Sequence, residues 1–292
     1  MPAAEVDVTA ELVRSLLEAQ HPDLAQLELR GLANGWDNAM FRLGEELVVR
    51  LPRRSVAAEL VAHESRWLPE LAPVLPFPVP APLWVGRPAG AYPWAWTIVP
   101  WFEGTVVGTS APTDPARLAT DLGRFLAALH QPAPPAAPVN PFRGTPLADR
   151  SGPVEGRIAT LAAHIDVARV REVWIDALQA PVWAGPPLWI HGDLHPLNFL
   201  EQDGGLAAVI DFGDIAGGDP ATDLLVAWAL FDEEHRSILR AAADTAVRPI
   251  DDAMWTRGRG WAIAHSLAIL ANSADAPILR AIGERTLAAA TE

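Results

Sequence analysis

The sequence contains no cysteine and no lysine, and it has only one tyrosine and three methionines among its 292 residues. Without cysteine, the chain has neither disulfides nor thiol chemistry, which suits a reducing cytoplasm. No apolar run is long enough to span a bilayer, and the N-terminal segment, acidic at Glu5 and Asp7, lacks the basic start of a signal peptide. We therefore expect a cytoplasmic protein with no membrane partner.

Positive charge is also scarce. The basic side chains number 22, all of them arginine, against 36 acidic side chains, and the formal net charge is −14. Nucleic acid is not expected as a partner, because binding to its phosphates needs basic stripes on the protein. The acidity would suit a cationic substrate, or it merely keeps the protein soluble. The absence of lysine means that any phosphate contact normally made by lysine has to be made differently.

Hydrophobic residues make up 50% of the chain, enough for a sizeable core in one or two domains. Short apolar runs predict strands at residues 27–32, 39–43, 47–51 and 94–99. Helical periodicity predicts helices at residues 9–19, 55–68, 115–130, 158–178, 220–231, 234–244, 253–271 and 276–290. These four strands precede residue 100 and most helices follow residue 104, which indicates an α+β organisation.

Polar groups gather in the segment WIHGDLHPLNFLEQDGGLAAVIDFGD, residues 189–214. The pair Gly204-Gly205 between two apolar runs predicts a two-residue hairpin turn, because both central residues of that turn favour positive φ. With this turn, Asn198 would lie directly opposite Asp211. Directly opposed residues have Cα atoms about 4.5 to 5.5 Å apart, so the two side chains could bind one cation.

Asp193 lies just upstream of this hairpin in a tight loop. One amide oxygen with one or two carboxylates suits Mg²⁺, which keeps several waters and takes its remaining ligands from substrate phosphates. A separate carboxylate nearby could accept a hydroxyl proton, and together these groups are the equipment of phosphoryl transfer. Two alternatives stay open. The polar residues could simply end strands and form turns, or His191, Asp193 and His195 could share one face of an extended segment and bind zinc.

The motif HGDLHPLN followed by IDFGD resembles the catalytic loop and the metal segment of the aminoglycoside phosphotransferase family, relatives of the protein kinases. The resemblance implies an α+β, protein-kinase-like fold of two lobes. It implies that Asp193 is the catalytic residue, that Asn198 and Asp211 hold Mg²⁺, and that ATP or GTP is the phosphoryl donor. The expected reaction moves the γ-phosphoryl group to a hydroxyl of a small molecule, with an aminoglycoside-type antibiotic as the first expectation.

The N-terminal half carries further residues of this resemblance. Arg50 matches the basic residue of the family's third strand, most often lysine, which contacts the nucleotide phosphates and pairs with a glutamate on the next helix. Glu64 lies inside the apolar stripe of that helix, where an unpaired carboxylate is costly, so we expect it to pair with Arg50. Asn38 ends a bend at residues 35–38, where kinases place a loop over the phosphates. Trp101 resembles a residue in the link between the lobes and could stack on the base, or simply pack in the core.

By this resemblance, residues 1–100 form a nucleotide-binding lobe, residues 101–104 a hinge, and residues 105–292 a helical lobe for catalysis and acceptor binding. The motif GDPATDL at residues 218–224 resembles the family's helix start, where we expect Asp219 and Asp223 to be structural, as helix caps or as acceptors from loop amides.

The acceptor stays open at this stage. It could be a macrolide or a metabolic amino alcohol or sugar, and the missing lysine also allows a nucleotide-binding module without catalysis. Four acids would suit an aminated acceptor, or they are ordinary charges at helix ends: Asp214, Asp232, Glu233 and Glu234. Whether the protein is a monomer or a dimer is likewise open.

Overall fold

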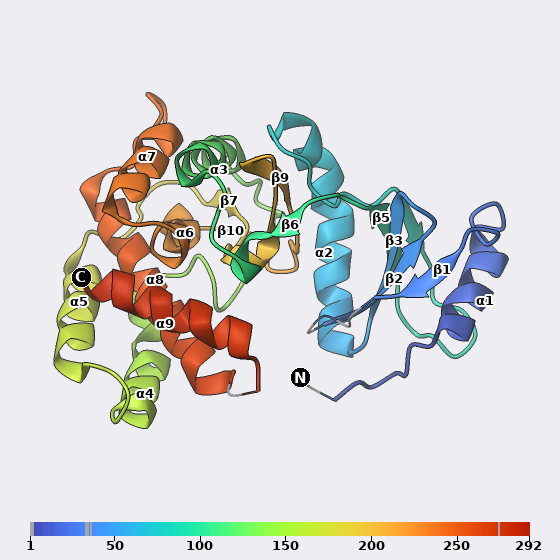
Figure 1. The fold of residues 1–292 in the computed structure, drawn as a ribbon, viewed down its shortest axis with the longest axis horizontal. Helices are drawn as coiled ribbons and strands as arrows, with labels where there is room; N and C mark the ends of the chain where they lie inside the picture. Colours follow the sequence, from blue (N-terminus) through green and yellow to red (C-terminus); the bar gives the residue numbers. More distant parts are fainter. Residues whose placement is uncertain (1–2, 33–34, 36, 274) are drawn as a thin grey trace. The chain divides into compact units, whose positions relative to one another are not determined.

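The computed structural model describes residues 3–32, 35, 37–273 and 275–292, and its chain forms two compact units (Figure 1). The N-terminal unit comprises Met1–Val74, Pro78–Glu103 and Asp211–Gly213. The C-terminal unit comprises Leu75–Phe77, Gly104–Ile210 and Asp214–Glu292. Three residues late in the sequence, 211–213, therefore belong to the N-terminal unit.

The N-terminal unit is built on an antiparallel sheet of five strands in the order β1-β2-β3-β5-β4. Helix α1 begins after Thr9, whose hydroxyl accepts a hydrogen bond from the Leu12 N–H, and its apolar face packs in the core of this unit. The elements are α1 (Ala10–Gln20), β1 (Leu29–Gly31), β2 (Asn38–Leu43), β3 (Leu47–Pro52), α2 (Ser55–Leu71), β4 (Trp84–Gly86) and β5 (Trp96–Pro100).

Strand β3 lies between β2 and β5, and its residues from Val48 to Pro52 are buried. Val49 and Leu51 pack in the core with Trp96 and Ile98 of β5. Arg50 alternates with these two apolar residues, so its side chain leaves the opposite face of the sheet. The strand thus fixes a buried guanidinium group at a defined place on the sheet.

The C-terminal unit is mainly helical and contains two small sheets, β10-β7 and β6-β8-β9. Its strands are β6 (Thr105–Val106), β7 (Leu188–Ile190), β8 (Phe199–Gln202), β9 (Gly205–Val209) and β10 (Ala216–Gly218). Its α-helices are α3 (Pro115–Leu129), α4 (Ser151–Leu161), α5 (Val167–Gln179), α6 (Val226–Leu230), α7 (Glu233–Ala243), α8 (Asp252–Asn272) and α9 (Pro277–Thr291). Short 3-10 segments cover Ala72–Val74, Val107–Thr109, Leu147–Arg150, Pro196–Asn198 and Pro220–Leu225.

Helix α8 is the core helix of this unit. Buried residues occur along its length and on all its sides, as expected for a helix surrounded by other elements. Helices α4, α5 and α9 all pack against it, and α9 crosses it in Figure 1. Within the described residues, no helix is both long enough and apolar enough to cross a membrane.

Two predicted helices differ from the structure. The stretch predicted as one helix over residues 158–178 belongs to two helices, α4 and α5, separated at residues 162–166. Asp166 caps α5 by accepting a hydrogen bond from the Arg169 N–H, which begins a new helix inside the predicted one. The helix predicted at residues 220–231 starts as a 3-10 segment, Pro220–Leu225, and continues as α6.

The predicted hairpin register is wrong by one residue. Asp203 and Gly204 form the turn with φ values of 52° and 79°, rather than Gly204 and Gly205. Aspartate tolerates this left-handed conformation better than most residues with a Cβ atom. A bulge lies between Leu200 and Glu201. As a result, Asn198 accepts a hydrogen bond from the N–H of Ile210 (2.9 Å) instead of facing Asp211.

Candidate functional site

A buried ion pair in the N-terminal unit joins Arg50 of β3 to Glu64 of α2, as the sequence predicts. Arg50 Nη1 lies 2.9 Å from Glu64 Oε2, and the two residues are only 7% and 1% exposed. Asp211 lies near the same guanidinium group, with Oδ1 4.0 Å from Arg50 Nη2. The backbone N–H of Phe212 also donates to Glu64, which holds residues 211–213 against this unit.

The electrostatics of this pair depend on burial. Burial raises the pKa of Glu64 and Asp211 adds to the rise, while the positive charge of Arg50 opposes it. Burial also disfavours the charged form of Arg50. The neighbouring carboxylate of Glu64 outweighs this effect, so the pKa of Arg50 is raised. Each charge therefore depends on its partner.

Asp211 itself adopts a left-handed backbone conformation with φ 62° just after the β8-β9 hairpin. Its side chain is 60% exposed, and its only ion pair in the described part of the chain is the 4.0 Å contact with Arg50. Oxygen ligands of this kind are those that Mg²⁺ prefers. The carboxylate is thus open to a cation.

Asn38 and Trp101 occupy two other places in the N-terminal unit. Asn38 begins β2, and its side-chain Oδ1 is buried without a hydrogen-bond partner in the described chain. The indole N–H of Trp101 donates to Glu103 (2.6 Å), and the guanidinium carbon of Arg42 lies 3.8 Å from the Trp101 ring centroid. One face of the indole is thereby covered by Arg42. Trp36, in the predicted bend, lies outside the described residues.

In the C-terminal unit, a buried carboxylate holds the loop that follows β7. Asp223 is fully buried and accepts hydrogen bonds from the backbone N–H groups of His191 and Gly192, both at 2.9 Å. His130 Nε2 lies 3.2 Å from the same carboxylate. Gly192 has φ 85°, and a Cβ atom there would come within 2.6 Å of the Asp214 carbonyl oxygen. This position therefore requires glycine.

His191 supports the loop through both nitrogens of its ring. Its Nε2 lies 3.0 Å from the carbonyl oxygen of Ile210, and its Nδ1 accepts a hydrogen bond from the Asp193 N–H (3.3 Å). This pattern assigns a neutral ring that donates from Nε2. The side-chain amide of Asn198 donates to the Asp193 carbonyl (2.8 Å), so the loop and the start of β8 are tied together.

The zinc alternative has little support in this geometry. Because both ring nitrogens of His191 contact the backbone, they are poorly placed to bind a metal. Among the residues that the structure describes, no group of three or more histidine, cysteine, aspartate or glutamate side chains is arranged to hold a metal ion.

Three basic side chains surround the carboxylate of Asp193. Arg143 Nη2 and His265 Nε2 lie 3.2 and 3.3 Å from its Oδ1, and His195 Nε2 lies 3.4 Å from its Oδ2. Burial alone would raise the pKa of Asp193. The positive charge and hydrogen bond of His195, the hydrogen bond of His265 and the charge of Arg143 instead lower it well below its usual range. The carboxylate is therefore held ionised.

The sequence motifs do not reveal Arg143 or His265 as neighbours of Asp193. They are 50 and 72 residues away along the chain, one in a proline-rich loop and one in the middle of α8. A basic residue in a loop and a histidine in an apolar helix carry no local signal for such a contact. The sequence suggests His195 only as part of a possible zinc site.

The family assignment follows from the sequence. The model of the phosphotransferase enzyme family matches residues 28–261, which is most of the chain. The chain belongs to this family. The predicted membership in the aminoglycoside phosphotransferase group of enzymes is thereby confirmed. The matched range contains Arg50, Glu64, Asp193, Asn198 and Asp211.

Solved phosphotransferase structures have the same fold. The structure of APH(2")-IIia with GDP and kanamycin aligns with a TM-score of 0.71 and 21% identity, covering 95% of this chain and 97% of that chain. The GDP complex of wild-type aminoglycoside 2'-phosphotransferase-IIIa aligns with a TM-score of 0.68 and 20% identity, covering 97% and 99%. The apoenzyme of macrolide 2'-phosphotransferase MphH from Brachybacterium faecium aligns with a TM-score of 0.58 and 26% identity. The alignment covers 94% of this chain and 96% of that chain.

The comparison with curated proteins gave no match. The structural similarities confirm the predicted kinase-like α+β fold of this phosphotransferase, with an antiparallel sheet in the N-terminal unit and a mainly helical C-terminal unit.

The expected structural aspartates of this phosphotransferase have structural contacts. Asp219 accepts from the Ala221 N–H (3.0 Å) at the start of a 3-10 segment and forms a buried pair with Arg257, at 2.7 and 3.2 Å. Asp223 accepts from the loop amides described above. Asp223 therefore positions the loop, while Asp219 caps the 3-10 segment and pairs with Arg257.

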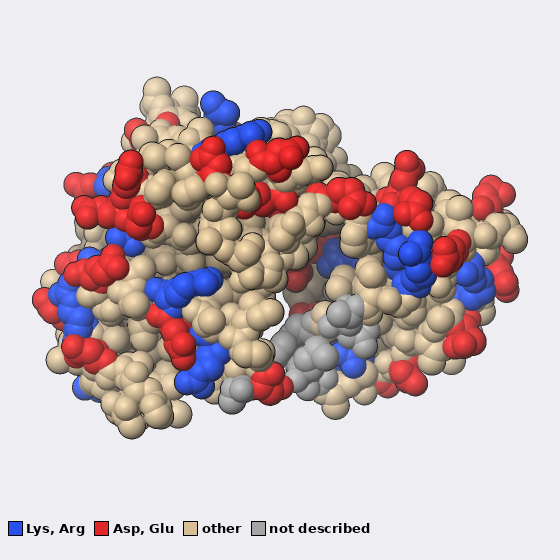
Figure 2. All heavy atoms as spheres, viewed as in Figure 1, with Lys and Arg blue, Asp and Glu red and all other residues tan. Residues whose placement is uncertain are grey.

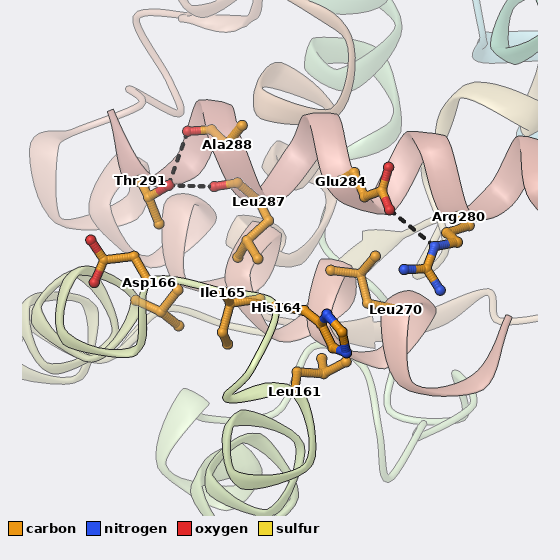
Figure 3. Close-up of a pocket in the computed structure, with 11 residues that line it drawn as sticks. Leu161, His164, Ile165, Asp166, Leu270, Arg280, Glu284, Leu287, Ala288 and Thr291 are labelled. Atoms are coloured by element: carbon orange, nitrogen blue, oxygen red, sulfur yellow. Dashed lines mark hydrogen bonds and ion pairs between the residues drawn. The ribbon is translucent and has the colours of Figure 1, made fainter. Parts of the chain in front are cut away.

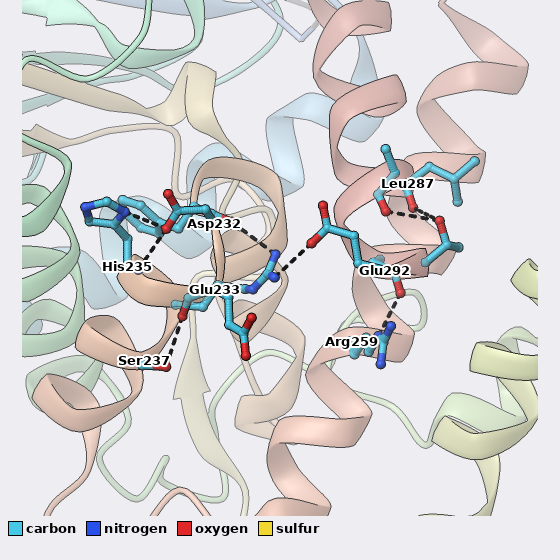
Figure 4. A network of polar contacts seen from close by, with 12 residues as sticks. Asp232, Glu233, His235, Ser237, Arg259, Leu287 and Glu292 are labelled. Atoms are coloured by element: carbon cyan, nitrogen blue, oxygen red, sulfur yellow. Dashed lines mark hydrogen bonds and ion pairs between the residues drawn. The ribbon is translucent and has the colours of Figure 1, made fainter.

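Two of the four acids that would suit an aminated acceptor, Asp232 and Asp214, are used in other contacts. Asp232 caps α7 by accepting from the N–H and the ring of His235, at 3.0 and 2.6 Å (Figure 4). The backbone hydrogen bond from His235 also lowers the pKa of Asp232. Asp214 accepts from the Asn140 side chain at 2.6 Å. Glu233 and Glu234 lie in the first turn of α7, where negative charge is favourable.

A separate pocket of about 260 Å³ lies in the C-terminal unit, between the α4–α5 connection, α8 and α9 (Figure 3). Leu161, Ile165, Leu270 and Leu287 give it an apolar lining, and Arg280 and Glu284 pair across one turn of α9 at 3.0 Å. None of the predicted site residues lines this pocket.

Proposed function

We propose that this protein transfers the γ-phosphoryl group of ATP or GTP to a hydroxyl group of a small molecule. The observation that carries the proposal is the Asp193 loop, whose amides are held by Asp223 and whose half-buried carboxylate is kept ionised by its basic neighbours. The proposal is also supported by structurally similar phosphotransferases that have been solved with GDP, ADP or ATP bound.

In the proposed step, the acceptor oxygen forms a new bond to Pγ while the bond from Pγ to the β,γ-bridging oxygen breaks. The nucleoside diphosphate leaves, and the hydroxyl proton passes to Asp193 and then to solvent. A carboxylate with a low pKa is a weak base. In a loose phosphoryl-transfer transition state the hydroxyl proton is lost late, so the contribution of Asp193 is mainly to orient the hydroxyl.

Asn198 and Asp211 are the residues that would hold Mg²⁺. Both offer oxygen atoms, Asp211 is open to solvent, and the amide nitrogen of Asn198 is engaged with the Asp193 carbonyl, which leaves the amide oxygen as the ligand. The metal would neutralise charge on the phosphates when bound.

Arg50 would contact the nucleotide phosphates in place of lysine, oriented by Glu64. Asn38 would contribute at the phosphate loop, and Trp101 would meet the base through the ring face that Arg42 leaves open.

The acceptor suggested by the family resemblance is an aminoglycoside. The descriptions of neighbours that bind kanamycin, gentamicin or streptomycin support this choice, and two macrolide phosphotransferases among the neighbours support a macrolide. The charges around Asp193 favour a different acceptor class, which is developed in the next subsection.

The test of the proposed function is substitution of Asp193 with alanine. We expect phosphoryl transfer to fall by about 10² to 10⁴, with nucleotide affinity measured by calorimetry nearly unchanged. Asp176→Ala, at an exposed acid of α5 in the same unit, serves as the matched control. Turnover of Asp193→Ala at the wild-type rate would contradict the proposal.

Two further variants test the nucleotide site. Asp211→Ala should weaken the binding of Mg-nucleotide more than that of free nucleotide, because it removes a metal ligand. Arg50→Lys restores the usual residue type of the family, and we expect it to keep phosphoryl transfer within about tenfold of wild type, since both side chains can neutralise a phosphate.

A further inference from the structure

Each side chain that contacts the carboxylate of Asp193 in the described structure is basic: Arg143, His195 and His265. Arg143 carries the lasting positive charge among them, because burial lowers the pKa of His265. The carboxylate of Asp193 is already paired with this arginine, so a positively charged acceptor finds no free carboxylate there and is opposed by the charge of Arg143.

Two more arginines extend this basic surface. Arg150 precedes α4, and Arg157 lies seven residues later, two turns along the same face of the helix. The guanidinium group of Arg150 lies 5.5 Å from the ring centroid of Phe142, the residue next to Arg143. Both arginines are half-buried. We call Arg143, Arg150 and Arg157 the arginine cluster.

The cluster is not neutralised by the protein. Within the described residues, Arg150 and Arg157 form no ion pair or side-chain hydrogen bond, and the buried Nε of Arg143 has no partner. Burial, followed by the charge of Arg143, lowers the pKa of Arg150, with a partly opposing effect of Asp149. Burial and the charges of the other two arginines likewise lower the pKa of Arg157.

The exposed Asp149 opposes the charge effects on Arg150 only in part, and two other acids nearby are engaged elsewhere. Glu155 on α4 pairs with Arg171 of α5 at 2.9 Å, and Asp214 accepts from Asn140. Three half-buried guanidinium groups that repel one another are costly unless an anion binds them, and arginine is well suited to bind carboxylate and phosphate with paired hydrogen bonds.

We propose that the acceptor of this phosphotransferase is a hydroxyl compound that carries a carboxylate or phosphate group, which the arginine cluster binds. The proposal rests on the proposed function and names its acceptor class. When the anionic group binds, Arg143 exchanges its contact with Asp193 Oδ1 for the acceptor. That oxygen is then free to receive the acceptor hydroxyl. The bonds formed and broken in the transfer are those given above.

The net charge of −14 does not conflict with this class. Acidic side chains are spread over the visible face of the molecule with arginines between them (Figure 2), so the overall acidity gives little information about one site. The local charges around Asp193 decide which acceptor can approach it. The cationic acceptor considered from composition is thus replaced by an anionic one.

The experiment compares acceptors of different charge on the full chain. Glucose 6-phosphate, gluconate, glucose, glucosamine and kanamycin are titrated calorimetrically into protein saturated with Mg-ADP, so that the nucleotide phosphates occupy their own site. The same compounds are then assayed for phosphoryl transfer from ATP and GTP. Comparing the binding of glucose 6-phosphate with that of gluconate shows whether the cluster prefers a phosphate or a carboxylate group.

We expect the two anionic compounds to bind more tightly than glucose and kanamycin. The double variant Arg150→Gln/Arg157→Gln should weaken the anionic compounds about tenfold or more, because it removes charge-assisted contacts. It should leave glucose affinity unchanged. The control variant Arg124→Gln replaces an exposed arginine of α3 in the same unit. It should change neither the affinity for the anionic compounds nor the affinity for glucose. Urea midpoints of all variants verify folding.

Three results would overturn the proposal, and they have different consequences. If kanamycin or glucosamine binds more tightly than the anions and is phosphorylated in an Asp193-dependent manner, the acceptor class is wrong while the proposed function holds. If anions bind to the wild type and to Arg150→Gln/Arg157→Gln equally, the cluster is no acceptor site. Arginine-dependent binding without transfer to any compound, from ATP or GTP, would instead contradict the proposed function and the acceptor role with it.

Discussion

The Arg50–Glu64 pair allows a quantitative test of the interior of the N-terminal unit. Both residues are almost fully buried, at 7% and 1% exposure, and their charged atoms lie 2.9 Å apart. Removing one member of such a pair leaves a buried charge without its partner, which costs about 3–5 kcal/mol. Replacing both members with apolar residues of similar size is often close to neutral.

The two single variants should differ because of Asp211. Glu64→Leu leaves Arg50 with the carboxylate of Asp211 at 4.0 Å. We therefore expect the free energy of unfolding to fall by about 3 kcal/mol, the lower end of this range. Arg50→Met leaves two carboxylates near each other and should cost nearer to about 5 kcal/mol. The double variant should be less destabilised than either single one, and a loss below about 3 kcal/mol there corresponds to a coupling energy above about 5 kcal/mol.

The Arg50→Met variant should also depend on pH. Burial and Asp211 raise the pKa of Glu64 in the folded state, and loss of Arg50 removes the opposing effect. A carboxyl group whose pKa is raised on folding destabilises the fold above its unfolded pKa. Stability is recovered as the pH falls below the folded pKa. The loss in Arg50→Met should therefore be smaller at about pH 5 than at about pH 8.

Urea unfolding followed by tryptophan fluorescence measures these free energies, and hydrogen exchange of the β3 amides assigns the transition to the N-terminal unit. Additive losses in the double variant, or a loss below about 1 kcal/mol in either single variant, would refute a tightly coupled buried pair. So would a loss in Arg50→Met that does not change with pH.

Three other predictions concern the Asp193 loop. Gly192→Ala should destabilise the protein by more than about 2 kcal/mol in urea unfolding, because φ is 85° and a Cβ atom would clash with Asp214; an unchanged midpoint would contradict this. Asp223→Asn should cost on the order of 3 kcal/mol, since a buried acceptor of two loop N–H groups becomes partly a donor, and wild-type stability would argue against it. In pH–rate profiles, Arg143→Met should shift the acidic limb of kcat/KM to higher pH, because one cause of the lowered pKa of Asp193 is removed. An acidic limb at the wild-type pH would show that Arg143 has no such effect.

Much of the fold and of the local chemistry could be predicted from the sequence. The burial of Glu64 followed from its place in an apolar helical stripe, and the structure pairs it with Arg50. Asp223 was expected to accept from loop amides or cap a helix, and it accepts from two. These predictions succeed because each depends on short-range periodicity or on a motif that fixes a backbone conformation.

Other features depend on choices that sequence patterns do not determine. The hairpin turn could have used either of two neighbouring pairs, and Asp203 takes the left-handed position that a glycine was expected to fill. One such shift, together with a bulge, removed the expected pairing of Asn198 with Asp211. The contacts of Arg143 and His265 with Asp193 join distant parts of the chain, and only tertiary packing brings them together.

The most direct test of the central claim is phosphoryl transfer measured by ³¹P NMR with Mg²⁺ and ATP or GTP, on wild-type protein and Asp193→Ala. Acceptors of each charge class are tested in parallel. We predict a new phosphate ester with at least one acceptor, formed by the wild type and lost in Asp193→Ala. A product formed equally by both proteins, or no product from any acceptor with nucleotide bound, would contradict the assignment of this chain as a phosphotransferase that acts through Asp193.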